Sequence, residues 1–411
     1  MTWVADQPYN ALPLLPPEGV ELDSKRILKS CFKARMELQA LNIRSSGVNT
    51  DLILRQIPLL EAQGSNEIEG VMTTADEMFA ADYRADARLK GPIKETLGYA
   101  EALTRYVGLP LDTGLAEEIC SSIKGERMNV RVASRDGKRT RIGNRGFEEK
   151  IIYTPPEGEG LIREKLRNWG EFVWCSVNQE RNPPQPNNYD PELDPIVRLA
   201  LAHYQFEAIH PFSDGNGRTG RILNVLFLIN AGLLDKPILY HSRAILKRKE
   251  EYYHLLRQVT EKREWEPWIL FVASVIEETA KWTLSQIEKI NELKDHTTNY
   301  VLDRLGDNAD QRMVDLIFDK PVTVISDVVE RGIAKRETAS KKLKKLAKLD
   351  ILVERKKGRT LEYEHTKLFK VLNQVDNHHF EPYAEVYPPW VKEKMLNFSS
   401  KIGKAPERLD R

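Results

Sequence analysis

One charged, glycine-rich segment, HPFSDGNGRTGR from His210 to Arg221, most constrains how this chain can fold. It follows the segment PIVRLALAHYQFEAI, whose apolar residues recur at the three-to-four spacing of a helix. It precedes ILNVLFLINAG, which is apolar on nearly every side, as a helix buried all round must be. The pattern predicts a polar turn between two core helices. A fold rarely keeps that much charge beside its centre without a use for it.

The turn has the features of an anion-binding site. Gly215 and Gly217 allow positive φ angles and a close approach of a ligand to the backbone. The helix that is expected to begin near Arg218 directs its unpaired N–H groups and its positive dipole end into the turn. Arg218 and Arg221, one helical turn apart, add two guanidinium groups suited to phosphate oxygens.

Two further residues of the turn indicate a reaction at phosphorus. Asp214 supplies a hard oxygen ligand of the kind that Mg²⁺ prefers. His210 can accept a proton from an attacking hydroxyl, because a neutral imidazole is available near pH 7. The residues therefore favour phosphoryl or nucleotidyl transfer to an alcohol. The alternative is a helix–helix turn with a capping Asp and solvated arginines.

Eight residues of this segment match the pattern HxFx(D/E)GNGRxxR, and on them the chain resembles the Fic (filamentation induced by cAMP) family. The resemblance implies a protein adenylyltransferase, which transfers AMP from ATP to a Ser, Thr or Tyr hydroxyl of a target protein or of itself and releases pyrophosphate. It implies that His210 is the general base and that Asp214 holds Mg²⁺. The nucleotide-binding residues that it implies are Asp214, Gly215, Asn216, Gly217, Arg218, Thr219, Gly220, Arg221 and Tyr252.

The resemblance leaves several activities and contacts open. The family also includes transferases of UMP or phosphocholine and enzymes that remove AMP. A DNA-binding transcriptional regulator with a nucleotide-sensing Fic core is an alternative of a different class. Tyr252 is either a nucleotide contact or a core residue, and Thr260 stands where relatives can carry a nucleotide-binding Asn. Trp265 and Trp268 are expected to close the core.

An earlier segment, SNEIEG at residues 65–70, resembles the inhibitory helix of Fic proteins. Ser65 and Glu69 are four residues apart and share one helical face. Pro58 suits the first position of this helix, and Gly70 the position just past its end. The resemblance implies that Glu69 pairs with Arg221 and holds the enzyme in a low-activity state. A solvated surface Glu is the alternative.

The composition changes over residues 129–160, where β-branched pieces alternate with glycines and arginines. RIGN and KIIY predict a β-hairpin. The hairpin resembles the Fic flap, which holds the target chain by strand addition beside the catalytic His. Ile142 and Gly143 fall where the family has a similar pair. An ordinary basic surface loop is the alternative.

Residues 321–360 contain twelve Lys/Arg and five Asp/Glu, a net charge of +7 (12 − 5). PVTVISDVVERG predicts a short helix, KRETASKKLKKLAKL a second helix with its lysines outward, and ILVERKKGRTLEYE a hairpin. This is the order of a winged helix-turn-helix domain. Contact with DNA is one interpretation, and a module that docks another protein or forms a homodimer is the other.

We therefore expect a mostly α protein: a Fic fold helical core with a β-hairpin flap, plus a C-terminal winged helix-turn-helix domain. The expected divisions are an N-terminal helical segment at 1–90, a catalytic core at 91–285, a linker helix and winged helix at 286–375, and a tail at 376–411. The chain has a net charge of +1, three scattered cysteines, no leader-like N-terminus and no long apolar run. A cytoplasmic location without a membrane partner is expected.

Overall fold

The computed structural model of the chain describes residues 3–45, 50–73, 91–132, 140–143, 151–174, 190–357, 360–373 and 383. The chain divides into two compact units, Met1–Ser285 and Gln286–Arg411. The long helix α11 (Trp265–Leu305) begins in the first unit and ends in the second. None of the helices in the described ranges is both long and apolar enough to cross a bilayer.

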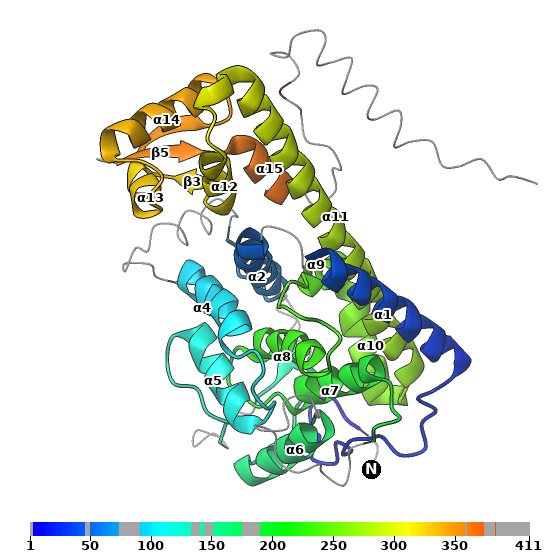
Figure 1. The fold of residues 1–411 in the computed structure, drawn as a ribbon. Helices are drawn as coiled ribbons and strands as arrows, with labels where there is room; N and C mark the ends of the chain where they lie inside the picture. Colours follow the sequence, from blue (N-terminus) through cyan, green and yellow to red (C-terminus); the bar gives the residue numbers. More distant parts are fainter. Residues whose placement is uncertain are drawn as a thin grey trace, which may run out of the picture. The chain divides into compact units, whose positions relative to one another are not determined.

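Two buried helices, α7 (Pro195–Ile209) and α8 (Asn216–Asn230), pack against each other at the centre of the first unit (Figure 1). The side chain of Asp194 accepts a hydrogen bond from the backbone N–H of Ile196, and Pro195 occupies the first turn. Nearly every residue of both helices is buried, as the apolar flanks of the charged segment predict. The turn between the helices is therefore fixed at both ends by the core.

The remaining helices of the first unit surround this pair. α2 packs against α4, α8 and α9, while α5 packs against α4, α6 and α8. The bounds of these helices are α1 (Lys25–Ser45), α2 (Thr50–Ile68), α4 (Pro92–Arg105), α5 (Thr113–Lys124), α6 (Glu159–Phe172), α9 (His241–Lys247) and α10 (Lys249–Lys262). Trp268 is fully buried and Trp265 is 6% exposed, so both close the core as expected.

The start predicted for the SNEIEG helix was wrong. α2 begins at Thr50, which places Pro58 inside the helix instead of at its first position. An interior proline removes one backbone hydrogen bond and costs roughly 3 kcal/mol. Here the first two turns bury Leu52, Ile53 and Ile57 almost completely. Burial of three such side chains gains roughly 5–9 kcal/mol, which exceeds the cost of the proline.

The flap segment contains a short antiparallel hairpin. β1 (Ile142–Gly143) pairs with β2 (Ile151–Tyr153), with Ile142 opposite Tyr153. The Tyr153 hydroxyl donates a hydrogen bond to the carbonyl oxygen of Ala208 at 2.7 Å, which ties β2 to the end of α7. Residues 144–150, which join the strands, lie outside the described residues.

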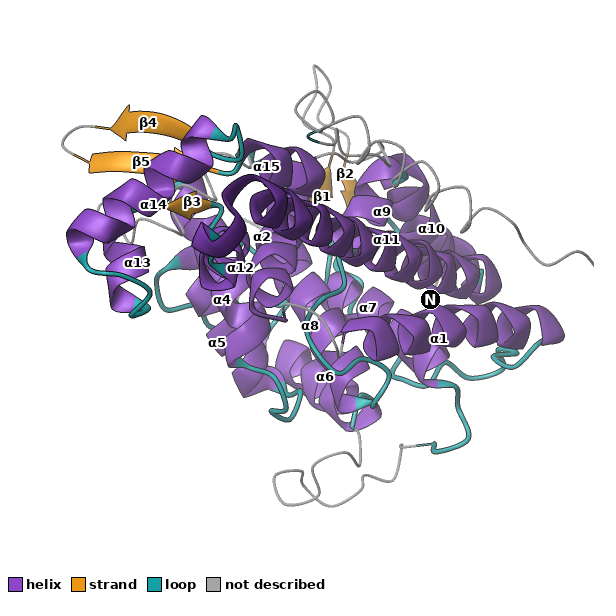
Figure 2. Cartoon of the chain, turned by 45° about the horizontal axis from the view of Figure 1, so that its top comes forward, coloured by secondary structure: helices purple, strands orange, loops and turns teal. Residues whose placement is uncertain are grey.

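In the described part of the second unit, a three-stranded sheet is combined with a 3-10 helix and four α-helices that follow α11 (Figure 2). The elements follow α11 in the order η1 (Gly306–Asn308), α12 (Gln311–Asp319), β3 (Val322–Thr323), α13 (Ile325–Glu330), α14 (Arg336–Lys348), β4 (Val353–Lys357), β5 (Thr360–Glu364) and α15 (Thr366–Asn373). The sheet order is β3-β5-β4.

Most of the elements predicted for the second unit are present, with one difference at its start. The helix predicted over PVTVISDVVERG is shorter, because Val322 and Thr323 form a strand that pairs with β5 before α13 begins. β-branched residues fit a half-buried pleated surface better than the first turn of a helix. Of the predicted tail at 376–411, the structure describes only Tyr383, which stacks on Tyr300 and His296.

Candidate active site

His210 ends α7 in a left-handed conformation, with φ 48° and ψ 60°. A residue with a β-carbon adopts this region at some cost, so neighbouring groups must hold it there. Arg131 does this. Its Nε donates to the carbonyl oxygen of His210 at 2.8 Å, and its Nη2 donates to those of Ile209 at 3.2 Å and Pro156 at 2.5 Å. Sequence reasoning missed Arg131, because a single arginine in an Arg-rich segment carries no local signal.

The imidazole of His210 is neutral over the physiological range. Burial and the positive charge of Arg131 lower its pKa to about 4. A neutral ring has one nitrogen free to accept a proton, which is what a general base needs. The next residues are fixed by packing: Phe212 is fully buried, and its ring lies 6.4 Å from that of Phe206.

The loop turns into α8 through Gly215 and Asn216. Gly215 has a φ of 85°, which favours glycine. The side-chain amide of Asn216 accepts from the Phe212 N–H and donates to the Phe212 carbonyl oxygen, both at 2.8 Å. This amide therefore clamps the loop, and its contribution to a ligand would come from its backbone N–H. The backbone N–H groups of the first turn of α8 face the concave side of this loop.

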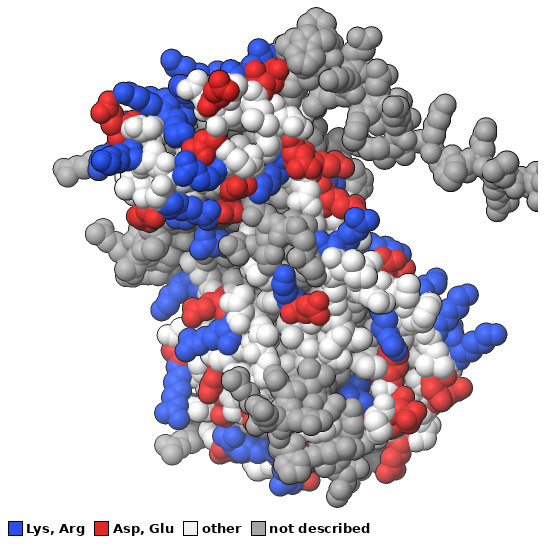
Figure 3. All heavy atoms as spheres, in the orientation of Figure 1, with Lys and Arg blue, Asp and Glu red and all other residues white. Residues whose placement is uncertain are grey.

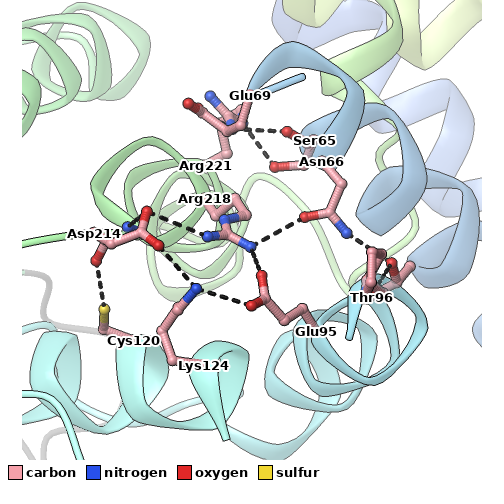
Figure 4. Close-up of polar contacts among 12 residues, drawn as sticks. Ser65, Asn66, Glu69, Glu95, Thr96, Cys120, Lys124, Asp214, Arg218 and Arg221 are labelled. Atoms are coloured by element: carbon pink, nitrogen blue, oxygen red, sulfur yellow. Dashed lines mark hydrogen bonds and ion pairs between the residues drawn. The ribbon is translucent and has the colours of Figure 1, made fainter. Parts of the chain in front are cut away.

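Arg221 is held by the helix that carries SNEIEG (Figure 4). Its Nε donates to Ser65 Oγ at 2.8 Å, and its Nη2 donates to the Ser65 carbonyl oxygen at 3.0 Å and to Glu69 Oε1 at 2.8 Å. The guanidinium is 1% exposed, whereas the Glu69 side chain is 34% exposed. The pairing of Glu69 with Arg221 that the family resemblance implies is thus present in the structure.

Glu69 also lies directly over the start of α8. A side-chain carbon on Gly217 would overlap Glu69 Oε1, so only a glycine leaves room for the carboxylate there. Burial alone would raise the pKa of Glu69, but Arg221 outweighs it and holds that pKa below its ordinary value. Glu69 is therefore an ionised carboxylate that lies against the N-terminus of α8, the position that favours an anion.

A second group of charges, which the sequence did not reveal, surrounds Arg218 and Asp214 (Figure 4). Glu95 on α4 pairs with Arg218 through one oxygen and accepts from Lys124 Nζ at 2.8 Å through the other. Lys124, the last residue of α5, also lies 2.8 Å from Asp214 Oδ2. Asp214 Oδ1 accepts from the Gly215 N–H at 2.6 Å. In this state the carboxylate that the resemblance assigns to Mg²⁺ is paired with an ammonium group.

The SNEIEG helix contacts the first arginine as well as the second. Asn66 Oδ1 lies 3.4 Å from Arg218 Nη1, and Asn66 Nδ2 donates to Thr96 Oγ1 at 2.7 Å. Together with the contacts of Ser65 and Glu69 to Arg221, this means that three polar residues of one helix hold both arginines of the loop.

Two buried carboxyl groups flank the site. Glu61 on α2 accepts from the Ser242 N–H at 2.8 Å and from the Tyr99 hydroxyl at 3.0 Å, and burial raises its pKa to about 7. Glu207, one turn before His210, has an Oε1 without a partner among the described residues, and burial raises its pKa to about 7 too. Glu61 anchors the helix that carries Glu69 to α4 and α9.

Three residues that the resemblance assigns to the nucleotide point away from the loop. Thr219 is fully buried beside the Cys120 thiol of α5, and a side chain on Gly220 would meet Glu207 on α7, so both positions serve the packing of α8 against its neighbours. Tyr252 is 2% exposed and its hydroxyl lies 3.0 Å from His203 Nε2, which makes it a core residue here. Its neighbour Tyr253 is 45% exposed, and the charges of Glu69 and Arg221 act on its hydroxyl.

The flap residues lie near the loop through their strand partner. Gly143 is exposed and Ile142 is half-buried. Because Tyr153 pairs with Ile142 and hydrogen-bonds to Ala208, β1 lies on the side of the unit where α7 ends in His210.

The first unit thus combines a helical core, a charged loop that leads into a buried helix, and a neighbouring hairpin. These are features of a helical protein with an anion-binding loop. Comparison with known proteins names the family. Residues 150–228 match the Fic/DOC family, residues 28–107 match the Fic/DOC family N-terminal domain, and residues 293–368 match the C-terminal domain of protein adenylyltransferase SoFic-like. The chain therefore contains a Fic/DOC family domain and, before it, a Fic/DOC family N-terminal domain.

Two curated relatives are both described as protein adenylyltransferase Fic. The protein of Drosophila willistoni is 37% identical over 139 residues, which cover 32% of this chain and 24% of the relative. The protein of Drosophila grimshawi is 38% identical over 127 residues, which cover 30% of this chain and 22% of the relative. The chain thus spans about a quarter of the length of these relatives.

Solved structures of Fic proteins are more distant. A Fic family protein from Desulfovibrio desulfuricans G20 is 18% identical, with a TM-score of 0.48, and the match covers 84% of this chain and 97% of that one. Fic-1 from C. elegans is 20% identical, with a TM-score of 0.44, over 64% and 72% of the two chains.

Proposed function

We propose that this protein transfers AMP from ATP to a hydroxyl side chain of a protein, and that Glu69 keeps the resting enzyme in a low-activity state. The observation that carries the proposal is the position of the Glu69 carboxylate, which lies over Gly217 at the start of α8 and 2.8 Å from Arg221. A buried arginine and a helix N-terminus that already hold one anion are suited to a phosphate group. The similarity to proteins described as adenylyltransferases supports AMP as the transferred group.

In the proposed reaction the hydroxyl oxygen of the target attacks the α-phosphorus of ATP. The new bond joins that oxygen to the α-phosphorus, and the bond from the α-phosphorus to the bridging oxygen of the β-phosphate breaks. The hydroxyl proton passes to the neutral imidazole of His210, and pyrophosphate leaves. Arg218 and the backbone N–H groups at the start of α8 neutralise and orient the phosphate chain, since positioning and charge stabilisation dominate phosphoryl-transfer catalysis.

The residues present fit a magnesium ion that arrives with its nucleotide. The Asp214 side chain is 61% exposed at the rim of the loop and offers a hard oxygen ligand. Among the described residues no group of three His, Cys, Asp or Glu side chains could hold a metal ion by itself. Mg²⁺ commonly keeps water ligands and uses one or two carboxylates plus substrate phosphates, which matches a single Asp. When bound it would neutralise charge on the phosphates.

The inhibitory part of the proposal follows from competition for Arg221. While Glu69 is in place, the outward-facing Nη2 of Arg221 already has a carboxylate partner. A nucleotide phosphate that uses this arginine must displace Glu69, and breaking a buried charge pair opposes that step. Conversion of Glu69 to Gly removes the competing carboxylate and leaves Ser65 to hold the guanidinium.

The test follows transfer of label from α-³²P ATP to protein in a native lysate with added Mg²⁺. We expect Glu69→Gly to label a target or itself at least about tenfold faster than wild type, since the pair that it removes is worth more than ~1.4 kcal/mol. Label should disappear in Glu69→Gly combined with His210→Ala. The control is Glu67→Gly, which removes a carboxylate two positions earlier and places the glycine inside α2, where it weakens the helix more than a glycine at 69 would.

Other outcomes would contradict separate parts of the proposal. Label from γ-³²P ATP would indicate a kinase, and label from UTP in place of ATP would indicate a different transferred group. Loss of label from a protein labelled beforehand would indicate removal of AMP. Equal labelling by wild type, Glu67→Gly and Glu69→Gly would leave the transferase and reject Glu69 as its inhibitor.

A further inference from the structure

The outward face of α14 in the second unit is a stripe of lysines. Lys341, Lys344, Lys345 and Lys348 are all exposed, at the i, i+3, i+4, i+7 spacing of one helical face. The opposite face carries Ala339, Leu343 and Leu346, which are buried. Because the buried face fixes the rotation of the helix, the lysines have to point into solvent.

The charge of this stripe is largely uncompensated. Lys341 pairs with Glu337 on the same helix at 2.7 Å. Within the described residues no carboxylate lies within ion-pair distance of Lys344, Lys345 or Lys348. Figure 3 shows Lys and Arg side chains of the second unit over the region of α14. The whole chain has a net charge of only +1, so this is a local feature and not a general basic character.

The hairpin β4–β5 adds a second basic element. All five residues of β4, VERKK, are exposed, and β4 is an edge strand of the sheet. Arg355 pairs with Glu364 at 2.5 Å, whereas Lys356 and Lys357 have no carboxylate partner in the described part of the chain. The order of α13, α14 and a basic hairpin is that of a winged helix-turn-helix, whose second helix enters the major groove.

We propose that the second unit binds duplex DNA, with the lysine face of α14 in the major groove and the hairpin β4–β5 against the phosphate backbone. The width of the major groove of B-form DNA admits one α-helix. Lysines at the spacing seen on α14 can reach phosphates on the two sides of such a groove, and each contact releases counterions.

The chemistry of the face distinguishes DNA from the other partners that a basic surface can have. The exposed residues of α14 are Arg336, Glu337, Thr338 and the four lysines, and none is apolar or aromatic. Protein interfaces are depleted in lysine and depend on apolar and aromatic anchors, which this face lacks. Single-stranded nucleic acids are bound by stacking on aromatic residues, and the deep major groove of duplex RNA excludes a helix.

The same composition predicts binding with little dependence on sequence. Arg, Asn and Gln read base edges in bidentate geometry, and among the exposed residues of α14 Arg336 alone is of these types, while the four lysines dominate the face. Phosphate contacts fix position but carry no sequence information. We therefore expect micromolar affinity for DNA of any sequence, with a strong dependence on salt.

The experiment measures binding of the full chain to a random-sequence DNA duplex of about 30 base pairs by fluorescence anisotropy, from 50 to 200 mM NaCl. The test variant is Lys344→Gln/Lys345→Gln/Lys348→Gln, because glutamine keeps helix propensity and removes three charges. If the three lysines contact phosphates, the slope of log K against log salt should fall by about 2.7, at ~0.9 per contact. Affinity at 100 mM NaCl should weaken at least about tenfold.

The matched control is Lys25→Gln/Lys29→Gln/Lys33→Gln on α1, which removes the same three charges from exposed positions of the first unit. It should bind DNA as wild type does, and both variants should melt at the wild-type temperature. Equal weakening by both triple variants would reduce the effect to overall charge and overturn the proposal. So would an unchanged slope in the α14 variant.

Two further probes complete the test. A duplex RNA of the same length should bind at least about tenfold more weakly than DNA, since α14 cannot enter its major groove. Comparable affinity for duplex RNA, for single-stranded DNA or for vesicles rich in phosphatidylserine would contradict the helix-in-groove geometry. None of these measurements depends on nucleotide transfer by the first unit.

Discussion

Glu69 Oε1 lies 2.8 Å from Arg221 Nη2, although the two residues are 152 positions apart in the chain. The contact joins the residue that follows α2 to the second turn of α8, and Ser65 binds the same guanidinium from one turn earlier on α2. α2 is fixed in turn by the buried carboxyl of Glu61. The resting state of the loop therefore depends on how firmly one helix is held.

Ser65→Ala should weaken the hold on Arg221 without removing Glu69. The substitution leaves Arg221 Nε without its acceptor in a buried site, at a cost of roughly 1–3 kcal/mol. We expect a labelling rate from α-³²P ATP between those of wild type and Glu69→Gly. If both residues act through Arg221, the double variant should be no faster than Glu69→Gly. Additive effects would mean that Ser65 has a separate role.

The sequence was sufficient to predict the loop, because its residues are contiguous and its flanking helices have unmistakable apolar patterns. The short motif that holds Ser65 and Glu69 is weak by itself, and only the resemblance to the Fic family implied that Glu69 pairs with Arg221. Glu95, Lys124 and Arg131 could not be found in this way. Each is a single charged residue in a helix or loop rich in charge, and it meets the loop across 79 to 123 positions of chain.

One expectation failed because a local rule was applied without knowledge of packing. Pro58 is a good first helical residue, but burial of the preceding two turns outweighs its cost. Tyr252, for which the sequence left open a nucleotide contact or a core position, is buried on α10, and its neighbour Tyr253 lies beside the charges of the site. A one-residue difference in helix phase moves a side chain by about 100°.

Arg131→Met should slow transfer and change its pH dependence. The substitution removes the N–H donors that hold the carbonyl oxygen of His210. It also removes a positive charge that lowers the pKa of the His210 imidazole. The pKa of His210 should therefore rise from about 4 toward its ordinary value. Because the base must be neutral, activity is lost as pH falls through this pKa, so the acid limb should move to higher pH. The measurement is the pH–rate profile in the Glu69→Gly background.

Arg127→Met is the control for Arg131, because Arg127 is an exposed residue of the same connecting segment. It should leave the acid limb and the rate unchanged. A slower Arg131→Met enzyme with an unmoved acid limb would show that Arg131 acts on the backbone alone. An unchanged rate would exclude any positioning role for Arg131.

Lys124→Met should lower the Mg²⁺ concentration needed for nucleotide binding. In the resting state the Lys124 ammonium lies 2.8 Å from Asp214 Oδ2, so a metal ion must displace it. Asp214 is well exposed and such a pair is worth about 1 kcal/mol at most, which corresponds to a two- to fivefold shift. Titration of Mg²⁺ against ATP binding, followed by calorimetry, measures it. Lys94→Met on the same side of the unit is the control, and a raised requirement in Lys124→Met would contradict the prediction.

Glu61→Gln should remove a pH dependence from the stability of the first unit. Burial raises the pKa of Glu61 to about 7, whereas an unfolded glutamate titrates near ~4.3. The folded chain therefore binds this proton more tightly than the unfolded chain. Stability is highest below pH ~4.3, and it falls as pH rises toward 7, where Glu61 ionises in a buried site. The neighbouring His241 offers Glu61 no positive charge, because burial lowers its pKa to about 3 and leaves it neutral. Buried histidines with lowered pKa values add stability as pH rises, so the contribution of Glu61 is taken from the difference between wild type and Glu61→Gln.

The contribution of Glu61 to the free energy of unfolding should fall by on the order of 2 kcal/mol between pH 5 and pH 8. Urea unfolding at both values measures it, with tryptophan fluorescence as the signal. Burial raises the pKa of Glu207 to about 7 as well, so Glu207→Gln should remove a pH-dependent contribution of similar size. The double variant should lack both contributions. If the stability difference between wild type and Glu61→Gln is the same at pH 5 and pH 8, Glu61 is ionised throughout. In that case the hydrogen bonds from Ser242 and Tyr99 would be charge-assisted contacts that hold α2 in place.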